Sequence, residues 1–167
     1  MNRIIFLDID GVLNSNFWND SHHREISDGT LVDAEKVKLL STLVKRTNSK
    51  IILHSGWKYW FDQDLKPLCQ EAENLLMLFK KEELLLEGVT PDHSTEEIRN
   101  NKKFSLVKAS EILAWLAEHK TVDNWIVIDD LDLHNKEIEI HQVRTDPSIG
   151  LTIADVHKAE KILFSSD

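Results

Sequence analysis

The sequence predicts an α/β protein of three layers, in which a mainly parallel sheet carries helices on both faces. Short apolar runs alternate with longer amphipathic stretches along the chain, as expected when each strand is followed by a crossover helix. Three of the apolar runs are followed directly by polar side chains, which suits strands whose carboxyl ends form a ligand-binding edge. The 167 residues contain no linker or internal repeat, so we expect a single domain over residues 1–167.

Three strands are expected in the first half of the chain. The run IIFLDIDGVL places the first strand over residues 3–9, and shorter apolar runs place the next two over residues 50–54 and 84–88. An amphipathic stretch predicts a helix over residues 32–46, between the first two strands. A further helix is expected to begin near Tyr59.

The second half continues the alternation. Residues 90–103 are polar and predict a loop or a partly helical excursion, whereas residues 107–119 form a strongly amphipathic helix pattern. The apolar run WIVI predicts a fourth strand over residues 125–128, and a fifth strand is expected over residues 137–143. The chain is expected to close with a helix over residues 152–164.

Composition and charge limit the possible partners. The formal net charge of −9 argues against extensive non-specific binding to nucleic acid, which depends on Lys and Arg at the phosphates. No apolar stretch approaches the roughly 20 residues needed to cross a bilayer, and the acidic Asp8 and Asp10 interrupt what would be a signal peptide. Cys69 is the single cysteine, which favours a reducing compartment. We therefore expect a cytoplasmic protein without a membrane partner, and no stable protein partner is implied.

The most informative residues are two aspartates at the end of the first predicted strand. Side chains alternate along a strand, so Asp8 and Asp10 are expected on the same side. A buried carboxylate without a partner is costly, so this pair indicates a bound cation. Gly11 follows, where the chain must turn sharply and lets its backbone approach a ligand.

Further polar residues follow the second and fourth predicted strands, Ser55 in IILHSGW and Asp129–Asp130 in WIVIDD, while Lys108 precedes the fourth strand. In a parallel sheet these groups converge on one crevice. Two carboxylates about 4 Å apart repel by roughly 4 kcal/mol at an effective dielectric near 20, so such a group needs positive charge. Oxygen ligands together with a substrate phosphate suit Mg²⁺.

In this order DIDGVL, Ser55, Lys108 and Asp129–Asp130 resemble the four motifs of the haloacid dehalogenase-like (HAD-like) phosphohydrolase superfamily. The resemblance implies a Rossmann-like fold. It also implies that Asp8 is the nucleophile that forms an aspartyl-phosphate, and that Asp10 is first the general acid and then the general base. An aspartate at position 10 favours phosphoester hydrolysis over dehalogenation.

The same resemblance assigns the ligands. Ser55, Gly56 and Lys108 would hold the phosphoryl oxygens. Mg²⁺ would be held by Asp8, by the backbone carbonyl of Asp10 and by one or both aspartates of the later pair, Asp129 and Asp130.

A closer resemblance rests on HSGWK, KASEILAWL and TDPSIGLT. These segments resemble the HAD domains of Swiss-army-knife RNA repair proteins, which implies a phosphatase acting on nucleic-acid ends. The polar segment 14–30 is too short for a helical lid, so no large cap domain is expected. An open site favours a large substrate, either a nucleic-acid end or a phosphoprotein.

Several alternatives stay open on sequence alone. Ser55 could simply cap the following helix, and Lys102 or Lys103 could take the role of Lys108. Trp57 could stack on a base or pack in the core, and the His22–His23 pair could bind metal or lie in a solvated loop. The protein could also be a protein phosphatase, or a catalytically weak module that binds phosphate or nucleic acid.

Overall fold

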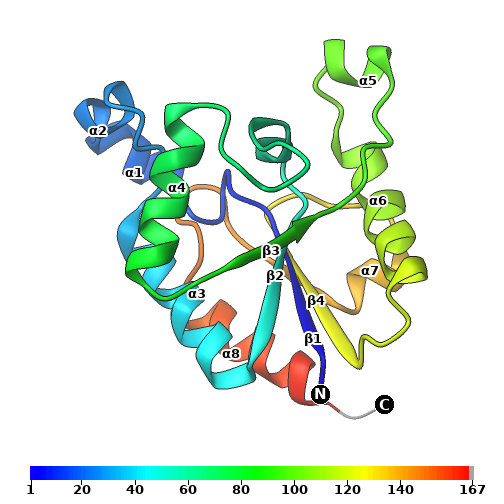
Figure 1. Ribbon diagram of the computed structural model, residues 1–167. Coiled ribbons are helices and arrows are strands. Elements are labelled where there is room, and N and C mark those ends of the chain that lie inside the picture. Colours follow the sequence, from blue (N-terminus) through cyan, green and yellow to red (C-terminus); the bar gives the residue numbers. More distant parts are fainter. Residues whose placement is uncertain (166–167) are drawn as a thin grey trace.

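A five-stranded, all-parallel sheet forms the centre of the molecule (Figure 1). The structure is a computed structural model and describes residues 1–165. The strand order is β3-β2-β1-β4-β5, so the order reverses beside the central strand β1. The strands are β1 (Arg3–Leu7), β2 (Ser49–Leu53), β3 (Leu86–Val89), β4 (Asn124–Asp129) and β5 (Gln142–Arg144).

Helices cover both faces of this sheet, which confirms the predicted three-layer α/β fold (Figure 1). Alternate residues of β1 belong to the two faces: Ile5 and Leu7 pack in one core, Ile4 and Phe6 in the other. Residues of α3 (Ala34–Thr47), α4 (Gln70–Lys81) and α8 (Ile153–Phe164) join the first core. Residues of α6 (Ser105–Glu118) and α7 (Lys136–Glu139) join the second. Apart from the two regions described next, the predicted strands and long helices agree with these bounds to within about two residues at each end.

The predicted fifth strand, over residues 137–143, is wrong up to residue 141. Residues 137–140 alternate as EIEI, but residues Lys136–Glu139 form the short helix α7, and β5 begins at Gln142. The Asn135 side chain accepts hydrogen bonds from the backbone N–H groups of Glu137 and Ile138 and so caps this helix. Local capping therefore outweighs the period-two pattern.

The helix expected from Tyr59 is also wrong in its start. Residues Gly56–Trp60 form only a 3-10 turn, η1, and the following helix α4 begins at Gln70. Between them, the Asp62 side chain accepts hydrogen bonds from the backbone N–H groups of Asp64 and Lys66 and closes a tight loop. Side-chain bonding of this kind competes with helix formation.

Short helices stand at the edge where the strands end. The segment 14–30 contains α1 (Asn16–Ser21) and α2 (His23–Ser27), and the excursion after β3 contains α5 (Glu96–Asn100). Figure 1 shows α1 and α2 on one side of this edge and α5 on the other, standing away from the body. We call residues 90–104 the arm. Within residues 1–165, no helix has both the length and the apolar character needed to cross a membrane.

Candidate functional site

The candidate site lies where the central strands end. β1 pairs with β2 on one side and β4 on the other, and these pairings continue past the strands. The Asp8 N–H donates to the carbonyl of Ile128 (3.0 Å), and the His54 N–H donates to that of Leu7 (3.1 Å). The residues that follow the three strands are therefore held next to one another, as the sequence predicted.

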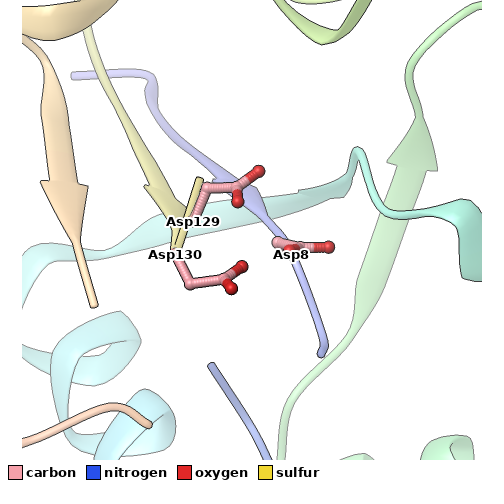
Figure 2. Close-up of side chains that lie close together, drawn as sticks. All are labelled: Asp8, Asp129 and Asp130. Atoms are coloured by element: carbon pink, nitrogen blue, oxygen red, sulfur yellow. The ribbon is translucent and has the colours of Figure 1, made fainter. Parts of the chain in front are cut away.

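Three carboxylates gather at this point (Figure 2). Asp8, Asp129 and Asp130 each present an oxygen, and these oxygens all lie within 4.8 Å of one another. Asp8 is 4% exposed and Asp129 0% exposed, so at least two of the carboxylates are shielded from water. A buried cluster made only of carboxylate oxygens is the donor set that a hard cation prefers, and it could hold a metal ion.

Lys108 supplies positive charge to this cluster from α6. Its Nζ lies 2.7 Å from Oδ2 of Asp129 and 3.3 Å from Oδ2 of Asp8. Burial opposes the charge on Lys108, but Asp8 and Asp129 outweigh this and raise the pKa of the ammonium group. Lys102 and Lys103 line the cleft but are exposed, so Lys108 is the lysine that the fold buries against the carboxylates.

Burial and mutual repulsion disfavour the ionised carboxylates of the acidic group. Burial, and then the neighbouring charge of Asp129, raise the pKa of Asp8 even though Lys108 acts in the opposite direction. Burial and the charges of Asp129 and Asp8 raise the pKa of Asp130 to about 7. Without a bound metal ion, Asp8 and Asp130 therefore tend to keep protons that ordinary aspartates would lose.

Gly11 makes room for Asp130. Its φ of +77° lies in the left-handed region, and a Cβ at this position would lie 2.6 Å from Cγ of Asp130. Both the backbone conformation and the close approach therefore require glycine here. This explains the glycine that follows the aspartate pair in the sequence.

Asp10 lies outside the acidic group. Strand β1 ends at Leu7 and the carboxylate of Asp10 is absent from the cluster, although Asp8 and Asp10 both line the same cleft. Its Oδ1 accepts from Nδ2 of Asn14 (2.9 Å), and its Oδ2 accepts from Nε1 of Trp57 (3.2 Å). Two donors thus fix an exposed carboxylate at the cleft.

Sequence reasoning missed the roles of Asn14 and Trp57. Asn14 also accepts a hydrogen bond from the Gly11 N–H (3.0 Å) and donates one to the Leu31 carbonyl (2.8 Å). Trp57 is 4% exposed, so it packs in the core while its indole N–H reaches Asp10. An asparagine close after the turn is a signal that could have been found, whereas the indole contact joins residues far apart in the chain.

Ser55 lies at the cleft and also caps η1. Its Oγ accepts a hydrogen bond from the Trp57 N–H (3.1 Å), and the residue is 2% exposed. Gly56 also lines the cleft, with open space where a side chain would be. The capping alternative for Ser55 is therefore observed, and the accepted bond leaves its hydroxyl proton free for another acceptor.

The His22–His23 pair and His54 lie in different environments. His22 stacks on Trp18 with ring centroids 4.5 Å apart, and neither His22 nor His23 belongs to a group of possible metal ligands among the described residues. His54 is buried with its Nε2 3.4 Å from Oδ2 of Asp129. Burial and the nearby Lys108 lower the pKa of His54 to about 3, so this ring stays neutral beside the acidic group.

The cleft above these residues has a volume of about 950 Å³. Asn16, Asn19 and Pro147 are among the residues that line it. Aromatic and basic residues from η1 and the arm also line it, and we call them the aromatic–basic wall: Tyr59, Trp60, Lys102, Lys103 and Phe104.

Comparison with known families gives one match. The model of a family described as the HAD domain in Swiss Army Knife RNA repair proteins matches residues 4–156, a range that includes all the site residues above. No curated protein and no solved structure matches the chain significantly.

The raised pKa of Asp130 predicts a pH-dependent stability in metal-free buffer. The folded protein keeps this proton up to a pH of about 7, whereas an unfolded aspartate loses it near 3.8, so Asp130 favours folding at low pH and this contribution disappears as the pH rises through that interval. The free energy of unfolding of the wild type, minus that of Asp130→Asn, should fall from pH 4 to pH 7 and then level. Urea unfolding with EDTA measures this difference, and a flat or rising difference would contradict the assignment.

Proposed function

Because the chain belongs to the family of HAD domains found in Swiss Army Knife RNA repair proteins, we propose that it is a Mg²⁺-dependent phosphomonoesterase with Asp8 as its nucleophile. Membership of this family indicates a HAD-type hydrolase. The observation that carries the finer proposal is the buried carboxylate of Asp8, which lies 3.3 Å from the Lys108 ammonium group at the floor of an open cleft.

The proposed reaction has two steps. An oxygen of Asp8 attacks phosphorus and forms an aspartyl-phosphate, while the bond to the leaving oxygen breaks and Asp10, as the general acid, supplies the proton to that oxygen. Asp10 then takes a proton from water, and the resulting hydroxide displaces Asp8 and releases phosphate. Asn14 and Trp57 support this role because their hydrogen bonds fix the carboxylate of Asp10 in one orientation.

The phosphoryl group would lie between η1 and α6. Lys108 would attract its oxygens from α6, and Ser55 has a free hydroxyl proton to donate from the opposite side. Gly56 adds space for close approach of the backbone. Preorganised donors of this kind stabilise charge that spreads over the phosphoryl oxygens in the transition state.

The cation would be held by Asp8, Asp130 and the backbone carbonyl of Asp10. When bound, Mg²⁺ would neutralise the carboxylates and draw negative charge from a phosphoryl oxygen. Both oxygens of Asp129 already accept hydrogen bonds, one from Lys108 (2.7 Å) and one from the Leu131 N–H (2.9 Å). We therefore assign direct binding to Asp130, and we assign to Asp129 the role of holding Lys108 in place.

The substrate that the cleft suits best is a nucleic-acid end. The family is named for RNA repair proteins, and the aromatic–basic wall offers rings for a base and ammonium groups for a second phosphate. Stacking of one base on an aromatic side chain contributes about 1–3 kcal/mol. A protein phosphatase would also use an open cleft, but the aromatic rings beside Lys102 and Lys103 favour a nucleotide chain.

The first prediction of the proposed function concerns the nucleophile. Asp8→Asn should lower the rate of phosphate release by more than about a thousandfold, because an amide is not a nucleophile at phosphorus. Release from p-nitrophenyl phosphate and from a 3′-phosphorylated oligonucleotide measures the effect, with circular dichroism as the control for folding. A variant with full activity would exclude Asp8 as the nucleophile. A wild type that binds oligonucleotides with metal but never releases phosphate would instead be a binding module.

The second prediction concerns the metal. Protons on Asp8 and Asp130 compete with a cation, because the pKa of each carboxyl is raised. Mg²⁺ should therefore raise the melting temperature more at pH 8 than at pH 5.5, and EDTA should abolish phosphate release. Asp130→Asn should reduce both the Mg²⁺-induced shift and its pH dependence. Equal shifts at the two pH values would argue against binding at these carboxylates.

The third prediction tests the substrate class. Phe104→Ala should raise KM for a 3′-phosphorylated oligonucleotide by about tenfold through loss of stacking, and should leave KM for p-nitrophenyl phosphate nearly unchanged. The oligonucleotide KM should also rise with salt if Lys102 and Lys103 contact phosphates. Assays with phosphopeptides provide the comparison. Faster turnover of phosphopeptides, without any effect of Phe104→Ala, would favour the protein phosphatase.

A further inference from the structure

A buried ion pair lies beside the proposed phosphate pocket and joins η1 to α6. Nζ of Lys58 lies 2.7 Å from Oε2 of Glu111, and the two side chains are only 6% and 4% exposed. These residues belong to HSGWK and KASEILAWL, two segments of the sequence that the proposed reaction does not fully explain. A role for the pair must account for two charges that have been removed from water.

The spacing of the pair repeats the spacing of the phosphate-binding residues. Lys58 in η1 comes three residues after Ser55, which caps η1, and Glu111 comes three residues after Lys108 in α6, which is close to one helical turn in each case. All four residues line one small cavity. The ion pair therefore lies about one turn from Ser55 and from Lys108, and it joins the two segments that carry them.

The same pair also anchors the start of the arm. Nζ of Lys58 donates a hydrogen bond to the carbonyl of Pro91 (2.9 Å), and Oε2 of Glu111 accepts one from the His93 N–H (3.0 Å). The far end of the arm brings Lys102, Lys103 and Phe104 to the cleft. One pair of charges thus contacts both the elements that bracket the phosphate pocket and the segment that forms much of its wall.

Stability alone is a poor explanation for this arrangement. A buried ion pair can often be replaced by apolar side chains of similar size without loss of stability, whereas removal of one partner leaves a costly buried charge. What apolar residues could not reproduce are the directional bonds from Lys58 and Glu111 to the backbone of the arm. The geometry is therefore better explained by positioning than by core formation.

We propose that Lys58 and Glu111 are positioning residues, which set the gap between Ser55 and Lys108 that receives the phosphoryl group and hold the arm beside the cleft. The proposal rests on the proposed function only in that the phosphoryl group is taken to bind in this gap. It assigns no chemical step to either residue.

The test compares Lys58→Met and Glu111→Leu, singly and together, with the wild type. Each single variant should have a lower melting temperature, and the double variant should regain most of that loss. The double variant should nevertheless bind inorganic phosphate, measured by calorimetry with Mg²⁺, about 10- to 100-fold more weakly, because small misplacements of binding groups have effects of this size. Its KM for p-nitrophenyl phosphate should rise by a similar factor.

Two further variants provide the controls. Glu111→Gln keeps an oxygen that can accept from Lys58 and from the His93 N–H, so it should retain most of the phosphate affinity. Lys45→Met with Glu83→Gln removes an exposed ion pair of equal length, 2.7 Å, that joins other elements. This second double variant should leave phosphate binding and KM unchanged.

A double variant that regains both its melting temperature and its phosphate affinity would overturn the proposal, because the pair would then be merely structural. If the double variant does not fold, Glu111→Asp replaces it. This variant keeps the charge but shortens the side chain, and unchanged phosphate affinity would again overturn the proposal. A wild type that binds phosphate but hydrolyses no ester would instead refute the proposed function, and the calorimetric comparison would still test the positioning role.

Discussion

Negative charge buried at the carboxyl end of the sheet is the constraint on which the site is built. Asp8 and Asp129 are almost fully buried, and Asp130 lies within reach of both. Such a group is stable in a folded protein only if positive charge or protons accompany it. Lys108 from α6 supplies one positive charge to the cluster. The pKa values of Asp8 and Asp130 are still raised, so this ammonium group does not fully compensate the burial and repulsion of the carboxylates.

This constraint extends to the residues around the carboxylates. Gly11 has no side chain because Asp130 occupies the space where a Cβ would lie. His54, beside Asp129, stays neutral because burial and Lys108 both disfavour its protonation. The helix that carries Lys108 is itself tied to η1 through Glu111 and Lys58. The acidic cluster, the proposed phosphate gap and the arm therefore form one connected arrangement of charges.

Much of the fold could be predicted from local sequence patterns. The apolar runs gave the strands of the sheet, because a strand buried on both faces is recognisable by its composition alone. The two regions that were predicted wrongly are those where a side chain bonds to nearby backbone: Asn135 caps α7, and Asp62 closes the loop after η1. Such bonds depend on the local conformation, and neither period-two nor helical patterning contains that information.

The residues alone were sufficient to indicate a parallel sheet, an edge rich in aspartate and a resemblance to HAD-like phosphohydrolases, which the family match confirms. These properties depend on the order of residue types along the chain. Three-dimensional packing was needed to show that the carboxylate of Asp10 lies outside the acidic cluster, to distinguish Lys108 from Lys102 and Lys103, and to join Lys58 to Glu111. The physical reason is that charge and hydrogen-bond partners are selected by distance in space, and those partners lie tens of residues apart in the sequence.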